Sequence, residues 1–209
     1  MGFLGGKVIT FIEDLQLTIN INVGNSLFDL FGKKKTVSLE VMRGDIVNQT
    51  GFDVVVSPTN EYFRFGVHSV DRYIAEAAGP GYFDEIKKLG SCKPGTAEVT
   101  IGYALPYNYV IHVVGRKWTS DQEAVDALKA CYICALDKAV QYKVKSIAFP
   151  SIGTGKHGFP YAKAAGIAVN TVEEYLSTHE AFFERIAWIV KDEVTFKAYR
   201  PLLENVVKK

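Results

Sequence analysis

The chain has 209 residues, of which 48% are hydrophobic and 22% are charged, a composition typical of a one-domain globular protein. Its 24 basic and 23 acidic residues leave a net charge of +1, which argues against a protein that coats nucleic acid or a membrane surface. No apolar run approaches the ~20 residues of a membrane span and the first residues do not resemble a signal peptide, so we expect a cytoplasmic protein.

The cysteine content argues against a disulfide framework and against a zinc site. There are three cysteines, Cys92, Cys131 and Cys134, an odd and small number. The pair Cys131 and Cys134 has CxxC spacing, but there is no second pair and the histidines are scattered. We therefore expect buried thiols within a helix, with no metal and no cofactor.

The first 35 residues precede a regular alternation of elements. Residues 7–12 and 17–23 are strand-like, and residues 25–31 predict a short helix that stops at Gly32. We expect residues 1–35 to form an N-terminal extension that packs on, or adds a strand to, a domain formed by residues 36–209.

From residue 36 onward, strand-like and helix-like segments alternate. Apolar and alternating runs predict strands at residues 36–42, 52–56, 96–103, 109–114, 144–149 and 185–190. Helical spacing of apolar residues predicts helices at residues 70–78, 82–89, 120–142, 161–176 and 192–206. In the longest helix we expect Ser120 as the N-cap and a core-facing row of Val125, Leu128, Ile133, Leu136 and Val140. The alternation predicts an α/β fold with helices on both faces of a mostly parallel sheet.

A glycine-rich segment, residues 149–160, joins a predicted strand to a predicted helix. Glycine lets the backbone turn its N–H groups inward, and a helix N-terminus adds roughly half a positive charge, so the segment suits an anion. A tight turn that binds nothing is the alternative. In such sheets ligands bind beyond the carboxyl ends of the strands, where residues 44–46 and 57–71 are also expected. This convergence favours the anion site.

Individual polar residues in these segments leave alternatives open. Asp45 could accept a hydrogen bond from an adenine amine, but an N-cap for the next turn is the simpler interpretation. Asn60 follows a buried strand, and a buried amide there needs protein partners or a ligand. Asp71 opens a helix, where capping alone would explain a carboxylate. His68 and His157 lie in loops, where a histidine is more often exposed than catalytic.

Distinct motifs occur in a fixed order along the chain: Gly44-Asp45-Ile46, Val56-Ser57-Pro58-Thr59-Asn60, Val70-Asp71, Ala77-Ala78-Gly79-Pro80, Gly95-Thr96-Ala97, Tyr109-Val110-Ile111-His112 and Phe149-Pro150-Ser151-Ile152-Gly153-Thr154-Gly155. In this order they resemble the macro domain family over roughly residues 36–207. Residues 145–160 are particularly similar to the macro domain fused to a histone variant, which is a binder and not an efficient hydrolase.

The resemblance implies a three-layer α/β/α fold with a mixed central sheet and a cleft for ADP-ribose or a related nucleotide. It implies that Asp45 takes the adenine amine, that the Ile46 backbone takes a ring nitrogen, and that Asn60 faces the distal ribose. It also implies that Asp71 activates a water in hydrolytic members. Two loops would hold the diphosphate, formed by Gly66, Val67 and Val70 and by Ser151, Gly153, Thr154, Gly155, Lys156, His157 and Gly158.

Four departures from the family pattern bear on catalysis and on the base. Hydrolytic members carry Asn-Ala-Ala-Asn where this chain has Ser57-Pro58-Thr59-Asn60, and a run of glycines where it has Gly66-Val67-His68-Ser69. A family histidine is replaced by Ala75. An aromatic residue after the last strand, which stacks on adenine in many members, is replaced by Lys191, for which Phe196 or the lysine stem is the substitute we consider.

Two functions follow from the resemblance. One is a module that binds ADP-ribose, free or on ADP-ribosylated protein. The other is an enzyme that hydrolyses ADP-ribosyl or O-acetyl-ADP-ribose linkages, with Asp71 and Asn60 as catalytic residues. A third interpretation is a degenerate macro fold that serves as a protein-interaction module without catalysis. We expect neither nucleic acid nor a membrane as a partner.

Overall fold

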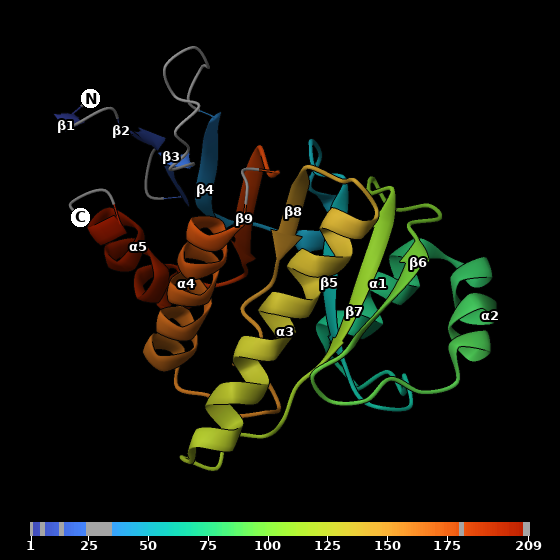
Figure 1. Ribbon diagram of the computed structural model, residues 1–209. Coiled ribbons are helices and arrows are strands. Elements are labelled where there is room, and N and C mark those ends of the chain that lie inside the picture. The colour runs from blue at the N-terminus through green and yellow to red at the C-terminus, as the bar shows by residue number, and fades with distance from the viewer. Residues whose placement is uncertain (1, 5–6, 13–14, 24–34, 180–181, 207–209) are drawn as a thin grey trace.

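The computed structural model describes residues 2–4, 7–12, 15–23, 35–179 and 182–206, and within these ranges a mixed sheet forms the centre of the molecule (Figure 1). The strand order is β1-β2-β3-β4-β9-β8-β5-β7-β6. Strands β4, β9, β8, β5 and β7 are parallel, whereas β1 to β3 and β6 run antiparallel to their neighbours. In chain order the strands are β1 (Gly2–Leu4), β2 (Lys7–Ile12), β3 (Gln16–Val23), β4 (Lys35–Arg43), β5 (Val54–Thr59), β6 (Ala97–Ile101), β7 (Tyr109–Val114), β8 (Ser146–Phe149) and β9 (Arg185–Val190).

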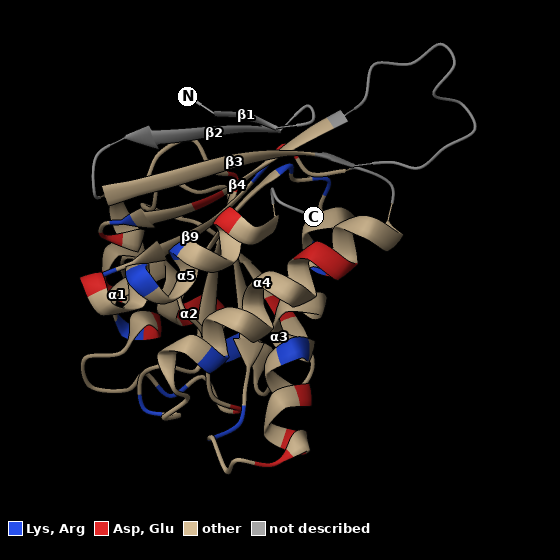
Figure 2. Cartoon of the chain, turned by 90° about the vertical axis from the view of Figure 1, so that its left-hand side faces the viewer, with Lys and Arg blue, Asp and Glu red and all other residues tan. Residues whose placement is uncertain are grey.

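Helices cover both faces of the sheet and complete a three-layer α/β/α fold (Figure 1). The helices are α1 (Val70–Ala78), α2 (Pro80–Leu89), α3 (Gln122–Gln141), α4 (Tyr161–Thr178) and α5 (Glu193–Val206), with a 3-10 turn η3 (Ile46–Asn48). Acidic and basic residues are interspersed over these helices and loops, and their numbers nearly balance (Figure 2). None of the helices in the described ranges is long and apolar enough to cross a membrane.

Two hydrophobic cores lie on opposite faces of the sheet. Val54 and Ile147 belong to the larger core, which α3, α4 and α5 complete. Their neighbours Val55 and Ala148 belong to the second core, which α1 and α2 complete. Successive side chains of a strand point to opposite faces, so a strand that is covered on both faces must be apolar at every position. This explains the continuous apolar runs in the sequence.

The predicted end of the second strand of the domain, at residue 56, is wrong by three residues. β5 continues through Ser57 and Pro58 to Thr59, and these residues pair with β7. On its other side β5 pairs with β8 only at Val54 and Val55. Proline lacks an N–H and is tolerated where one edge of a strand is unpaired, so Pro58 does not end the strand.

Two predictions for α3 are also wrong. The N-cap is Asp121, whose carboxylate accepts a hydrogen bond from the Ala124 amide at 2.8 Å. Ser120 has a φ of 61°, outside the extended conformation of an N-cap residue. Ile133 is 40% exposed, because Tyr132 faces the core and the next residue lies 100° around the helix. Leu128 and Leu136 do face the core as predicted.

The N-terminal strands join the sheet at its β4 edge. β3 pairs antiparallel with β4 from Gln16↔Met42 to Val23↔Lys35, and β2 and β1 follow outward. Leu17, Ile19 and Ile21 of β3 are buried in the larger core. The helix predicted at residues 25–31 lies outside the described residues.

Candidate functional site

The direction of the chain through the sheet reverses between β8 and β5. From β5 the chain continues to β6 and β7 at one edge, and from β8 it continues to β9 on the other side. In an open α/β sheet such a switch point leaves a crevice beyond the carboxyl ends of the strands. The short pairing between β5 and β8 allows these two strands to part there.

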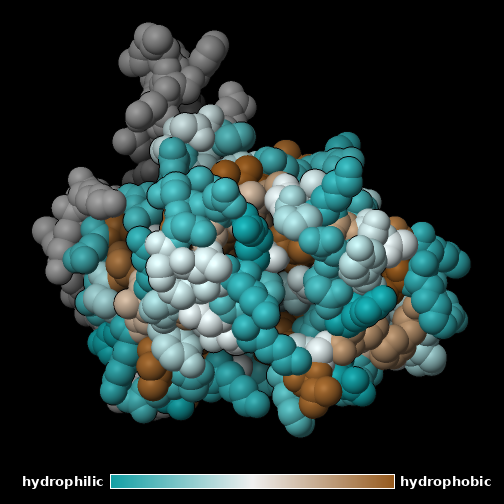
Figure 3. All heavy atoms as spheres, turned by 90° about the horizontal axis from the view of Figure 1, so that it is seen from below, coloured by the Kyte–Doolittle hydropathy of each residue, from teal (hydrophilic) through white to brown (hydrophobic). Residues whose placement is uncertain are grey.

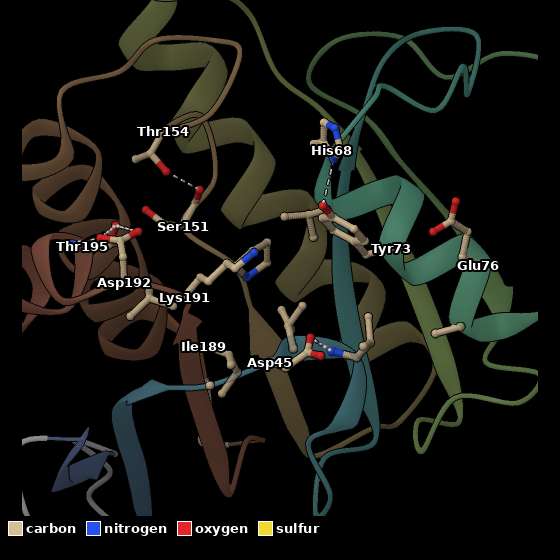
Figure 4. A pocket seen from close by; sticks show the side chains of 17 residues that line it. Asp45, His68, Tyr73, Glu76, Ser151, Thr154, Ile189, Lys191, Asp192 and Thr195 are labelled. Carbon is tan, nitrogen blue, oxygen red and sulfur yellow. Dashed lines mark hydrogen bonds between the residues drawn. The ribbon is translucent and has the colours of Figure 1, made fainter.

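A cavity of about 1050 Å³ opens at this end of the sheet. Figure 3 views the molecule from below, and polar residues surround recessed apolar ones on that face. The cavity walls come from the turn after β4, from α1, from the loop after β8 and from the segment that joins β9 to α5 (Figure 4). The volume is ample for a nucleotide-sized ligand.

The structure brings part of the predicted site to the cavity wall. The predicted residues that line the cavity are Asp45, Ile46, Val70, Ser151 and Thr154. The predicted residues outside its lining are Asn60, Gly66, Val67, Asp71, Gly153, Gly155, Lys156, His157 and Gly158. Lining residues with reactive or aromatic side chains that the sequence reasoning gave no role are His68, Tyr73, Glu76, Asp192 and Thr195.

The glycine-rich loop after β8 has the geometry of an anion site. Gly153 has a φ of 86°, and a Cβ on it would lie 2.9 Å from the Phe159 ring. The loop closes on itself, because the Phe159 amide donates to the Gly153 carbonyl at 3.0 Å and the Gly158 amide to Gly155 at 2.9 Å. Within the described part of the chain, the backbone amides of residues 154–157 donate no hydrogen bond. Four consecutive amides are therefore available to a ligand.

The second predicted loop meets the first. A Cβ at Gly66 would lie 2.7 Å from Nζ of Lys156, so the lysine side chain reaches from one loop to the other. Nζ is the far end of a flexible side chain, so a Cβ at position 66 would require Lys156 to shift and Ser69, 3.0 Å away, to adjust slightly. Val67, by contrast, is 64% exposed at the tip of its loop.

Asn60 is not the buried amide that the sequence suggests. It is exposed, and its Oδ1 accepts from the amides of Tyr62 and Arg64 at 3.2 Å and 3.1 Å. Its Nδ2 donates to the Arg64 carbonyl. The side chain therefore shapes the turn after β5, and its partners are protein groups.

Asp71 is 3% exposed at the start of α1, and its carboxylate has protein partners. One oxygen accepts from the Ser69 hydroxyl and from the Arg72 amide, the latter at 2.9 Å. The other lies 3.4 Å from the Thr59 hydroxyl. These contacts tie the start of α1 to the end of β5, which are the two ends of the second loop.

Asp45 caps the turn after β4, as the simpler interpretation predicts. Its carboxylate accepts from the Val47 amide at 3.2 Å and from Nδ2 of Asn48 at 3.0 Å. Asp45 is nevertheless exposed and lines the cavity, and two carboxylate oxygens have further lone pairs for a ligand. The Tyr107 hydroxyl donates to the Ile46 carbonyl at 2.5 Å and fixes the backbone of this turn. Burial raises the pKa of Tyr107, so it remains a donor.

Lys191 and Tyr73 face each other across the cavity. Nζ of Lys191 lies 5.8 Å from the centre of the Tyr73 ring, and the Tyr73 hydroxyl lies 3.3 Å from Nδ1 of His68 (Figure 4). Phe196, the aromatic residue considered in place of Lys191, is 3% exposed and packs in the larger core, so that suggestion is wrong. Helical spacing could have identified Tyr73, because it lies one turn after Val70.

Two other histidines are kept neutral by their surroundings. His157 is half-buried in the glycine-rich loop, and burial together with the nearby charge of Lys117 lowers its pKa. His112 is fully buried on β7, where burial lowers its pKa to about 3 and its Nε2 lies 3.0 Å from the Thr100 hydroxyl. His112 is thus a satisfied core residue.

The cysteines lie away from the cavity. Cys131 is buried on α3, where burial raises its pKa to about 12, and Cys134 is half-buried and donates to the Gly95 carbonyl at 2.9 Å. Among the described residues, no three His, Cys, Asp or Glu side chains are grouped so that they could hold a metal ion.

Comparison with known proteins supplies a family. The family model described as "Macro domain" matches residues 56–168. A macro domain-containing protein of Methanosarcina mazei is 43% identical over 143 residues, which cover 68% of this chain and 75% of that protein. The ADP-ribose glycohydrolase MACROD2 of Xenopus laevis is 37% identical over 170 residues, 80% of this chain. The matched region spans only 40% of that relative's length.

A solved structure has the same fold and a nucleotide. The Oceanobacillus iheyensis macrodomain with ADP is 28% identical and superposes with a TM-score of 0.75. The match covers 91% of this chain and 98% of that one. The fold therefore has a counterpart among solved macrodomain structures.

Proposed function

The chain belongs to the macro domain family, and from this premise we propose that it binds ADP-ribose, free or attached to protein, in the cleft beyond β8 and β5. The observation that carries the proposal is the row of available amides at residues 154–157. Backbone N–H groups that converge in a turn hold a phosphate without a metal. Relatives named as ADP-ribose glycohydrolases and a relative solved with ADP support this ligand.

The ligand's parts correspond to different walls of the cleft. The diphosphate lies against the glycine-rich loop, with Lys156 as a nearby positive charge. The adenine amine points to Asp45 at the other end, where the carboxylate has lone pairs to accept it. The distal ribose lies toward Gly66 and the turn shaped by Asn60.

Calorimetry tests the binding proposal. We expect heat on titration with ADP-ribose, and no heat would overturn the proposal and favour the interaction-module interpretation. Asp45→Ala should weaken ADP-ribose about tenfold, because a hydrogen bond to a charged group is lost. The same variant should bind ribose 5-phosphate, which lacks the base, as the unsubstituted protein does. An equal loss for both ligands would contradict the adenine assignment.

Hydrolysis of ADP-ribosyl or O-acetyl-ADP-ribose linkages is a second candidate function, favoured by the retained Asp71 next to the second loop. In this reaction Asp71 would deprotonate a water held near the diphosphate, and the loop amides would stabilise the developing charge. The carboxylate now accepts from Ser69 and Arg72, so it would have to exchange one partner for the water. Binding therefore requires no rearrangement of Asp71, whereas hydrolysis does.

Turnover separates the two functions. The protein is incubated with a mono-ADP-ribosylated protein and release of ADP-ribose is measured. Turnover that is lost in Asp71→Asn and kept in Asp84→Asn, an exposed acid on α2, would establish the enzyme. Tight binding without turnover would establish a binding module.

A cytoplasmic location also belongs to the proposal. Its support is the three cysteines, which are all free. Cell fractionation with an antibody to the chain would test it, and recovery in a membrane or secreted fraction would contradict it.

A further inference from the structure

Tyr73 is an aromatic side chain on the cavity wall, and it is not part of either hydrophobic core. It lines the cavity and is 40% exposed, so its ring is accessible to a ligand there. Among the described residues that line the cavity, Tyr73 is the only phenylalanine, tyrosine or tryptophan. The segment after β9, on the opposite wall, offers Lys191 in place of an aromatic ring.

The helix orients this ring toward the cavity. Val70, Tyr73 and Ala77 are spaced by three and four residues and all line the cavity, so one face of α1 forms the wall. The hydroxyl contact with His68 holds the outer end of the ring. The ring therefore has a polar partner before any ligand binds, which reduces the freedom that is lost when a flat group packs on it.

The face of the ring already attracts a cation. Nζ of Lys191 lies 5.8 Å from the ring centre, a contact that uses the negative face of the π-system. A cation at an exposed ring gains less than a nucleobase stacked on the same ring, so a base can displace the ammonium or share the ring with the lysine stem.

One base can stack on Tyr73 with its face and hydrogen-bond to Asp45 with its edge at the same time. Figure 4 shows the Tyr73 ring on α1 and the Asp45 carboxylate on the turn after β4 as two parts of one cavity wall, with Lys191 extending toward Tyr73 from the other side. A purine that stacks on Tyr73 presents its polar edge in its own plane, where Asp45 can accept from an exocyclic amine. Asp45 then selects the base and Tyr73 supplies the stacking surface.

We propose that Tyr73 on α1 is the surface on which the base of the nucleotide stacks, with Lys191 covering the opposite side. This inference rests on the proposed binding of ADP-ribose and assigns its base to one wall of the cleft. It makes Tyr73 a determinant of specificity for ligands that carry a base over ligands that carry only ribose and phosphate.

Calorimetry with two ligands and matched variants tests the inference. ADP-ribose carries the base and ribose 5-phosphate does not. We expect Tyr73→Ala and Tyr73→Leu to weaken ADP-ribose by about tenfold, the scale of one lost base–aromatic stack. Tyr73→Phe keeps the ring and should stay within about threefold of the unsubstituted protein. Ribose 5-phosphate should bind all four proteins alike. Tyr142→Ala, at a tyrosine that is also 40% exposed but lies at the end of α3 outside the cavity lining, is the matched control and should bind both ligands as the unsubstituted protein does.

Each contrary outcome has a distinct meaning. An unchanged affinity of Tyr73→Ala for ADP-ribose would overturn the stacking assignment while the proposed function stands. Equal weakening of both ligands would also overturn it, because Tyr73 would then act on the shape of the whole cleft. If the unsubstituted protein binds neither ligand, the proposed function fails and this inference fails with it. Thermal unfolding of each variant establishes that the protein is folded in every titration.

Discussion

Two glycines of the glycine-rich loop after β8 have different physical requirements. Gly153 has a φ of 86° and lies where a Cβ would come within 2.9 Å of the Phe159 ring. At Gly155 a Cβ would meet nothing within 4 Å, and its φ is not in the left-handed region. The sequence shows both as glycines in one motif, and only the backbone geometry distinguishes them.

Alanine substitution should separate these two glycines. Gly153→Ala should lower the free energy of unfolding by about 1–3 kcal/mol, because the residue is strained and crowds Phe159. Gly155→Ala should change it by less than about 0.5 kcal/mol. Urea unfolding at pH 7 measures both, and equal effects would show that the left-handed conformation of Gly153 is not required.

His112 should make stability depend on pH. Its pKa in the folded protein is about 3, below the ordinary 6.5, so the unfolded chain takes up a proton at a higher pH than the folded one. The free energy of unfolding should therefore fall as the pH falls from about 6.5 toward 3, by about 1.4 kcal/mol per pH unit from this residue.

The test is urea unfolding at pH 7, 6, 5 and 4. In His112→Gln, the contribution of residue 112 to the change of unfolding free energy with pH should disappear, since glutamine does not titrate. His179→Gln, at an exposed histidine, should keep the slope of the unsubstituted protein. If His112→Gln keeps the slope as well, another group carries it.

At the scale of elements, the start of α3 depends on one side chain. Asp121→Ala should destabilise the protein by about 1 kcal/mol, because the Ala124 amide loses its cap. Ser120→Gly, one residue earlier, should leave stability unchanged or raise it, since glycine adopts a φ of 61° without strain. Thermal unfolding measures both variants. A larger loss in Ser120→Gly than in Asp121→Ala would restore Ser120 as the cap.

The existence and type of most elements could be predicted because their apolar periodicity is strong. Their ends could not, since they depend on partners elsewhere in the chain. Whether Pro58 ends β5 depends on where β8 stops pairing, and whether Ile133 is buried depends on which face of α3 the sheet meets. Ser120 and Asp121 are both good N-cap residues, and only the backbone conformation decides between them.

At the scale of the whole molecule, β3 is part of the larger core and not only a link between β4 and the outer strands. Ile19 is fully buried there, while its neighbour Asn20 is half-buried. Ile19→Ala should therefore cost about 2–5 kcal/mol of stability, as for other buried isoleucines. Asn20→Ala should cost less than about 0.5 kcal/mol. Denaturant titration distinguishes these results, and a small effect of Ile19→Ala would mean that the sheet does not need β3.

The sequence predicted which end of the sheet holds the cleft, because residues 44–46, 57–71 and 150–159 all follow parallel strands. It did not predict which of their side chains contact other protein groups and which remain available to a ligand. Asn60 and Asp71 are chemically suited to a ligand, yet both have local protein partners, which depend on how the loop between them folds. Tyr73 was overlooked because an aromatic residue within a helix usually indicates the core.

The position of the cleft between the two cores has a consequence for the motions of the molecule. Val70, Ala77 and Ile189 line it from the second core, and Val190 lines it from the larger one. A ligand that touches both walls must leave before either wall opens on its own. Amide hydrogens at the start of both α1 and α5 should then exchange with deuterium more slowly when the cleft is occupied. The middle of α3 lines no part of the cleft, so its amides should exchange more slowly only to the extent that the ligand makes global unfolding rarer.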